Sequence, residues 1–106
     1  MTHDDVFQTL ADPTRRRVIA ALRHGEQSVG QLVEAVGIHQ SGVSRHLGIL
    51  NAAGFVDVRG EGAKRFYSLR AEPFRDLAAW LARYRGLFER REVKRRDRRT
   101  GPRWYD

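Results

Sequence analysis

The 106-residue chain contains no cysteine. Disulfide bonds, thiolate catalysis and the usual zinc-finger ligand sets are therefore excluded. Long apolar runs are also missing, and none approaches the roughly 20 residues that a membrane span needs. The first residues are polar and carry no basic run, unlike a signal peptide. We therefore expect a cytoplasmic protein that makes no membrane contact.

Acidic residues are fewer than basic ones, 13 against 20, which gives a net charge of +7 and a pI of about 11.0. An excess of this sign favours an acidic partner, nucleic acid first. Residues 90–99 hold seven basic and two acidic side chains, so most of the surplus lies there. We expect one domain over residues 1–90 and a basic tail over residues 91–106. Such a tail is usually a solvated helix end, although it can add nonspecific DNA affinity.

The pattern of residues 28–54 predicts two helices joined by a tight turn. Ser28 with Gln31 three residues later is a capping-box signature, which marks a helix start. Apolar residues then recur at helical spacing until Gly37, which stands where a left-handed cap ends a helix. A second helix is expected over residues 40–53. Its polar outer face consists of Gln40, Ser41, Ser44, Arg45 and Gly48.

Amide, hydroxyl and guanidinium groups on the outer face of a second helix are the groups that read base edges in a major groove. The segment therefore predicts a DNA-binding helix-turn-helix. An ordinary helical hairpin with a polar outer face is the alternative from this segment alone.

After Gly54 the apolar period changes from helical to two, which predicts strands over residues 55–59 and 64–69. The intervening Gly60-Glu61-Gly62 can supply the positive φ of a hairpin turn. A basic hairpin directly after a helix-turn-helix is the layout of a wing, which would press its cations onto phosphate or into a minor groove. A solvated hairpin is the alternative. The basic wing residues are Arg59, Lys64 and Arg65.

The terminal segments predict helices over residues 4–10 and 13–24 and a last helix that opens at Pro73. Large apolar side chains follow Pro73 at alternating spacings of three and four, a heptad-like pattern. So long an apolar stripe on so small a domain predicts a two-fold interface with a second copy. Packing wholly within the monomer is the alternative. The expected interface residues are Phe7, Leu10, Leu77, Trp80, Leu81, Tyr84 and Phe88.

Together these patterns predict a mainly α fold with a small β-hairpin, a winged helix-turn-helix whose terminal helices form a dimer interface. The sequence shows no Ser/His/Asp constellation, no Gly-rich phosphate loop and no carboxylate pair in a plausible cleft, so we expect no enzyme. A module that binds RNA or a protein partner through charge, without base readout, is the competing function.

Several blocks resemble one family. LADPTRRR at residues 10–17, VSRHL at 43–47, AGFV at 53–56 and GAKRFYSL at 62–69 are similar to the ArsR-type winged-helix repressors of bacteria and archaea. Residues 80–85, WLARYR, are similar to the last helix of the branch that lacks metal sites and includes small autorepressors. The resemblance implies a homodimer that binds inverted-repeat operator DNA and blocks transcription.

Carried over position by position, the resemblance gives the recognition helix and the wing their DNA contacts. Arg45 is the candidate for a bidentate contact to guanine. His46 lies at the flank of the apolar stripe, where it either contacts phosphate or packs against the neighbouring helix. The positions carried over are Gln40, Ser41, Ser44, Arg45 and His46 on the helix and Arg59, Lys64 and Arg65 on the wing.

The sequence departs from the family pattern in the recognition helix and the wing. His39 stands where serine usually caps the helix, so Ser41 is a candidate cap in its place. Gly42 and Gly48 each cost about 1 kcal/mol relative to alanine inside a helix. Ala63 occupies a wing position that is often arginine.

Metal sites known in the family use cysteines before the recognition helix, or Asp and His on the last helix. The matching positions here, SVGQ at residues 28–31 and a last helix without histidine or cysteine, lack such ligands. The four histidines also show no i, i+4 pairing. We therefore expect no metal and no cofactor. The histidines are His3, His24, His39 and His46.

Overall fold

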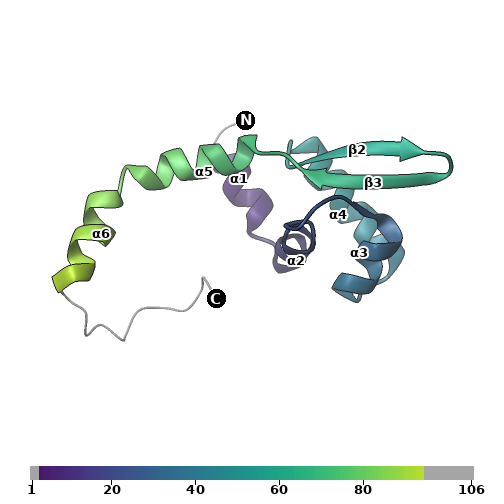
Figure 1. Cartoon of the computed structure of the whole chain (residues 1–106), viewed down its shortest axis with the longest axis horizontal. Coiled ribbons are helices and arrows are strands. Elements are labelled where there is room, and N and C mark those ends of the chain that lie inside the picture. Colours follow the sequence, from purple (N-terminus) through teal and green to yellow (C-terminus); the bar gives the residue numbers. More distant parts are fainter. Residues whose placement is uncertain (1–2, 95–106) are drawn as a thin grey trace.

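A computed structural model describes residues 3–94, which form six helices and a three-stranded antiparallel sheet of order β1-β3-β2. In Figure 1 the β2–β3 hairpin extends from one end of the body, and α5 and α6 extend from the other. This is the predicted winged helix-turn-helix. The elements in chain order are α1 (His3–Leu10), α2 (Pro13–Ala21), β1 (Gln27–Ser28), α3 (Val29–Val36), α4 (Gln40–Ala52), β2 (Val56–Glu61), β3 (Lys64–Leu69), α5 (Glu72–Ala82) and α6 (Arg85–Lys94).

The hydrophobic core lies between α2, α3, α4 and the start of β2. Phe55 is fully buried at the end of the turn after α4, and its ring meets Phe74 of α5 edge to face at 5.7 Å between centroids. The core thereby joins the base of the wing to the last helices. The buried hydrophobic residues are Val6, Val18, Ile19, Leu22, Leu32, Val36, Val43, Leu47, Leu50, Phe55 and Val56.

Side-chain caps begin α2 and α3, and the capping box predicted for Ser28 and Gln31 is present. Asp12 accepts hydrogen bonds from the backbone N–H groups of Thr14 at 2.7 Å and Arg15 at 3.2 Å, and these bonds lower the pKa of Asp12. Ser28 and Gln31 form the reciprocal capping box, with bonds of 3.2 and 2.8 Å. Each helix therefore begins where its sequence signal places it.

Helix α2 ends at Ala21 and not at the predicted residue 24. The Gln27 side chain donates a hydrogen bond to the carbonyl of Ala21, and Gly25 adopts a φ of 137° that turns the chain toward β1. The chain leaves the helix early because Gln27 and Ser28 pair with Tyr67 and Phe66 of β3.

Three consecutive arginines of α2 bind the carbonyl ends of neighbouring helices. Arg15 donates to the carbonyls of Thr9 and Gln8 at 2.8 and 3.3 Å, and Arg16 donates to Leu10 at 2.6 Å, all at the end of α1. Arg17 donates to the carbonyl of Val36 at the end of α3 at 2.8 Å. Cations at these positions satisfy unpaired carbonyls and the negative end of the helix dipole. The list of donors is Arg15, Arg16 and Arg17.

The predicted single C-terminal helix is wrong, because it breaks between Ala82 and Arg85 into α5 and α6. The last turn of α5 tightens into i to i+3 bonds, from Arg83 to Trp80 at 3.2 Å and from Tyr84 to Leu81 at 2.9 Å. Gly86 in the first turn of α6 weakens continuation of the helix. Within residues 3–94 no helix is long and apolar enough to cross a membrane.

Candidate nucleic-acid interface

The turn between α3 and α4 sets the direction of the candidate recognition helix. Gly37 adopts a φ of 78° and donates its N–H to the carbonyl of Val33 at 2.9 Å, which ends α3. A Cβ on Gly42 would lie 3.1 Å from Cδ1 of Ile38, so this glycine lets the turn approach the first turn of α4 closely. No side chain caps α4, and the proposed capping role of Ser41 is wrong because His39 holds the cap position without a side-chain bond.

The outer face of α4 is exposed, and its polar side chains have no bonding partner within the described residues. Val43, Leu47 and Leu50 are fully buried and fix the inner face against the core. The polar side chains on the other side make no hydrogen bond or ion pair within residues 3–94. Their donors and acceptors are available to a ligand. The exposed side chains are Gln40, Ser41, Ser44 and Arg45.

His46 does not belong to this exposed face. Its side chain is 5% exposed, and Nδ1 has no hydrogen-bond partner in the described part of the chain. Burial lowers the pKa of His46, and nearby Arg45 lowers it further, whereas Asp12 opposes the shift. The predicted DNA contact from His46 is therefore corrected: the imidazole packs inside, which was the second alternative for it.

The wing is a two-stranded hairpin with a tighter turn than the sequence suggested. Glu61 pairs with Lys64, so the loop consists of Gly62 and Ala63 alone, and Gly62 has a φ of 64°. Gly60 lies within β2, opposite Arg65. Of the predicted Gly60-Glu61-Gly62 turn, Gly62 supplies the positive φ, whereas Gly60 and Glu61 extend β2. A two-residue loop with Gly first matches the twist of the strands.

The wing and the recognition helix meet around one hollow of about 580 Å³. Gln40 and Ser44 face it from α4, and Lys64 and Arg65 face it from the tip of β3. Both cations are exposed and make no side-chain bond within the described residues. Two of the predicted helix residues are thus brought beside two of the predicted wing residues. The complete lining is Ser28, Val29, Gly30, Gln40, Ser44, Ala63, Lys64, Arg65 and Tyr67.

Arg59 differs from the other two wing cations. Its Nε and Nη2 donate to both carboxylate oxygens of Glu26, at 3.0 and 2.9 Å, and Nη1 lies 3.4 Å from Glu61. Its guanidinium carbon lies 4.7 Å from the centroid of the Phe66 ring. The bonds to Glu26 raise the pKa of Arg59 and lower that of Glu26. No sequence pattern indicated this partner, which lies 33 residues away.

The same part of the chain matches known proteins. Residues 10–59 match a family model described as a helix-turn-helix domain. The transcriptional repressor SdpR of Bacillus subtilis is 30% identical over 81 residues, which cover 76% of this chain and 90% of that protein. The probable mercury resistance operon repressor of Streptomyces lividans is 39% identical over 80 residues, which cover 72% of this chain and 64% of that protein.

Solved structures agree. The crystal structure of an ArsR family transcriptional regulator superposes with a TM-score of 0.71 at 32% identity, covering 81% of this chain and 89% of that one. The transcriptional repressor BigR from Xylella fastidiosa has a TM-score of 0.63 at 31% identity, covering 80% and 84%. This chain belongs to the ArsR family. The family consists of transcription regulators with helix-turn-helix DNA-binding domains and not of enzymes. The prediction of a DNA-binding regulator and the prediction that the chain is not an enzyme are therefore confirmed.

The ArsR-family chain exposes an apolar surface at the end opposite the wing. Phe7 of α1 meets Trp80 of α5 edge to face, with ring centroids 5.0 Å apart, and Trp80 lies 5.1 Å from the ring of Tyr84. Trp80 is half-buried, and Leu10 and Leu77 are half-buried against the hydrophobic core. Packing within one chain therefore covers only part of the stripe. The large apolar side chains left exposed there, by 38 to 57%, are Phe7, Leu81, Tyr84, Leu87 and Phe88.

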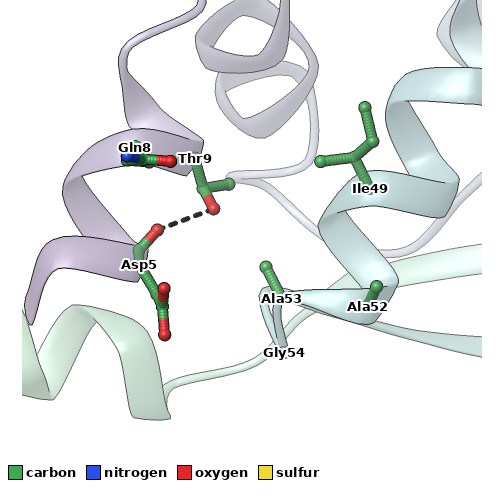
Figure 2. A pocket seen from close by; sticks show the side chains of 7 residues that line it. All are labelled: Asp5, Gln8, Thr9, Ile49, Ala52, Ala53 and Gly54. Carbon is green, nitrogen blue, oxygen red and sulfur yellow. Dashed lines mark hydrogen bonds between the residues drawn. The ribbon is translucent and has the colours of Figure 1, made fainter. Parts of the chain in front are cut away.

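A second hollow of about 560 Å³ lies where α1 meets the C-terminal end of α4. Figure 2 shows Thr9 and Asp5 of α1 on one side and Ile49, Ala52 and Ala53 on the other. The Thr9 hydroxyl donates to the backbone carbonyl of Asp5 at 2.9 Å. No lysine or arginine lines this hollow, so it lacks the cations that a phosphate contact needs.

Proposed function

We propose that the chain is a homodimeric repressor that binds an inverted-repeat DNA operator and is not controlled by a metal. The observation that carries this proposal is the hollow in which exposed polar groups of α4 face the free cations of the wing. A helix that reads bases beside a hairpin that holds phosphate supplies both parts of specific recognition. Repression is also what the names of the relatives SdpR and BigR state for those proteins.

Base readout is assigned to the outer face of α4. Arg45 is long, exposed and unpaired within the described residues, so its planar fork can donate twice to guanine O6 and N7. Gln40 can pair with adenine in the same way, and the Ser41 and Ser44 hydroxyls can bond either bases or phosphates. Lys64 and Arg65 are assigned to phosphates or to the minor groove, because cations at a hairpin tip suit those sites.

The dimer is assigned to the exposed surface of α1, α5 and α6. Exposed large side chains that adjoin one another are rare on monomers and mark interfaces. A two-fold axis through this surface leaves both wings and both α4 helices outside the contact, at the other end of each chain (Figure 1). Two identical DNA-binding surfaces, each made of α4 and the wing and related by two-fold symmetry, require an operator with two inverted half-sites.

Metal-independent control is supported by the lack of suitable metal-binding side chains in the described part of the chain. The chain has no cysteine. Within residues 3–94 no three His, Asp or Glu side chains are grouped so that they could hold a metal ion. His46 is buried on α4, whereas His24 and His39 are exposed on separate turns. The mercury-related name of one relative is therefore not carried to this chain.

The test is a selection of bound sequences from random duplex DNA at about 150 mM salt, which suppresses nonspecific attraction. We expect an enriched inverted repeat whose half-sites are about one helical turn, or a multiple of it, apart. Its affinity should not change when a chelator or a panel of divalent metals is added. Binding that depends on salt but enriches no sequence would contradict the proposal and favour a module that binds RNA or protein through charge.

A further inference from the structure

The guanidinium group of Arg59 already contacts three side chains of the protein: Glu26, Glu61 and Phe66. Glu26 accepts from Nε and Nη2 in a two-bond fork, Glu61 lies beside Nη1, and the guanidinium carbon lies over the Phe66 ring. A fork of this kind fixes orientation as well as distance. Lys64 and Arg65, five and six residues further on, have no such partners within the described residues.

Arg59 also projects from the wrong face of the wing for a contact in the hollow. Arg59 and Phe66 are cross-strand partners, so their side chains share one face of the sheet. Tyr67 and Arg65 line the hollow and alternate with Phe66 along β3, so they project from the opposite face. Lys64 shares the face of Phe66 and still borders the hollow, because it is the first residue of β3 beside the turn. Arg59 lies further from the turn on that face and does not line the hollow.

The link to Glu26 joins the wing to the body. Glu26 lies in the segment between α2 and β1, and β1 pairs with β3 at only two positions, Gln27 with Tyr67 and Ser28 with Phe66. Arg59 stands at the level of Phe66, the last of these pairs before the tip. Beyond it, residues 60–65 form a two-stranded hairpin that carries the free cations.

We propose that Glu26 and Arg59 form a brace that orients the wing, and that Arg59 is a positioning residue and not a DNA contact. The brace holds the tip so that Lys64 and Arg65 stay opposite Gln40 and Ser44. This inference rests on the proposed DNA-binding function and revises the contact set by removing Arg59. An exposed ion pair contributes little to global stability, so its effect is on wing orientation.

The test compares Arg59→Lys, Glu26→Gln and the double variant, with Lys64→Gln as the matched phosphate-contact control. Lysine keeps the charge but loses the fork, so a phosphate contact would survive Arg59→Lys and a brace would not. Affinity is measured on a duplex selected by the wild-type protein and on a mixed-sequence duplex, over about 50 to 200 mM salt. Amide hydrogen exchange of residues 60–65 is followed without DNA.

We expect Arg59→Lys and Glu26→Gln each to weaken binding of the selected duplex about fivefold, with the double variant no weaker than either, because both break one contact. The salt slope should stay as in the wild type, whereas Lys64→Gln should reduce it by about 1. Exchange at residues 60–65 should quicken in both brace variants while the thermal midpoint stays unchanged.

The brace is overturned if Arg59→Lys binds as the wild type, if Glu26→Gln binds more tightly because it frees Arg59 for phosphate, or if exchange at the wing tip is unaltered. Failure of the proposed function gives a different result. In that case the wild type selects no duplex, and the exchange measurement still decides whether the brace orders the wing.

Discussion

The rings of Phe7 and Trp80 meet edge to face at 5.0 Å between centroids, which joins the first helix to α5 although 73 residues separate them in the chain. Edge-to-face pairs hold two elements at a defined angle and add to the effect of buried area. The contact places the exposed parts of α1 and α5 side by side, and Trp80 in turn contacts Tyr84, which directly precedes α6. This is the surface on which the proposed dimer depends.

The first prediction concerns that surface. Leu81→Glu combined with Tyr84→Glu should convert the dimer to a monomer, because two carboxylates would be buried without partners. Analytical ultracentrifugation measures the change. Arg75→Glu, an exposed α5 position outside the apolar stripe, is the control and should leave the dimer intact. A wild-type chain that is already monomeric would refute the interface.

The second prediction concerns base readout. Arg45→Ala should weaken binding of the selected operator by about 1–3 kcal/mol and relax preference at one base position, because the guanidinium fork is lost. Titration of the operator and of single-base variants measures both effects. Arg75→Ala removes an arginine elsewhere on the surface and should leave affinity nearly unchanged. Equal affinity for wild type and Arg45→Ala would remove Arg45 from the readout.

The third prediction separates two glycines of the same helix. Gly48→Ala should raise the free energy of unfolding by about 0.5–1 kcal/mol, since its Cβ would have no neighbour within 4 Å and alanine favours the helix. Gly42→Ala should gain less, because its Cβ would lie 3.1 Å from Ile38. Urea denaturation compares the two variants. Equal gains would show that the contact with Ile38 imposes no constraint.

The fourth prediction concerns pH. Burial lowers the pKa of His46 below its ordinary 6.5, so under mildly acidic conditions the unfolded chain binds a proton that the folded chain excludes. The stabilising effect is therefore complete above pH 6.5 and is lost as pH falls toward the lower, folded-state pKa. Denaturant unfolding between about pH 7 and pH 5.5 should show falling stability.

His46→Gln is the matched variant for this experiment, because it keeps a polar side chain that does not titrate. Its stability should change less over the same interval. The lowered pKa values of Asp12 and Glu26 act below their ordinary values of 3.8 and 4.5, outside this window. An identical pH slope in wild type and variant would place the effect on another group.

Local signals in the sequence predicted local structure well. Ser28 with Gln31 and the left-handed Gly37 gave the bounds of α3, because each depends on bonds within four residues. Val43, Leu47 and Leu50 recur at the spacing of one helix face, and all three are fully buried.

Features that depend on distant partners were missed. His46 lies on the border of the apolar face of α4, where periodicity cannot decide between inside and outside. It is buried on the helix that α2 packs against, with Asp12 and Arg15 nearby. The Glu26–Arg59 link and the Arg17–Val36 bond join residues 33 and 19 positions apart. The helix break after Ala82 has no proline that would have indicated it in the sequence. The predicted tail over residues 91–106 falls mostly outside the described residues, which end at 94.

Within the described residues, the outer side chains of α4 make no hydrogen bond or ion pair to the rest of the fold. Selection for DNA recognition can therefore act on these side chains separately from selection for folding. Substitutions at Gln40, Ser41, Ser44 or Arg45 leave the core, the caps and the wing brace untouched. A duplicated gene could therefore acquire a new operator by changes on this one face while its product remains folded. Conversely, substitutions of the α2 arginines should be selected against mainly because they impair folding, and less because they alter regulation.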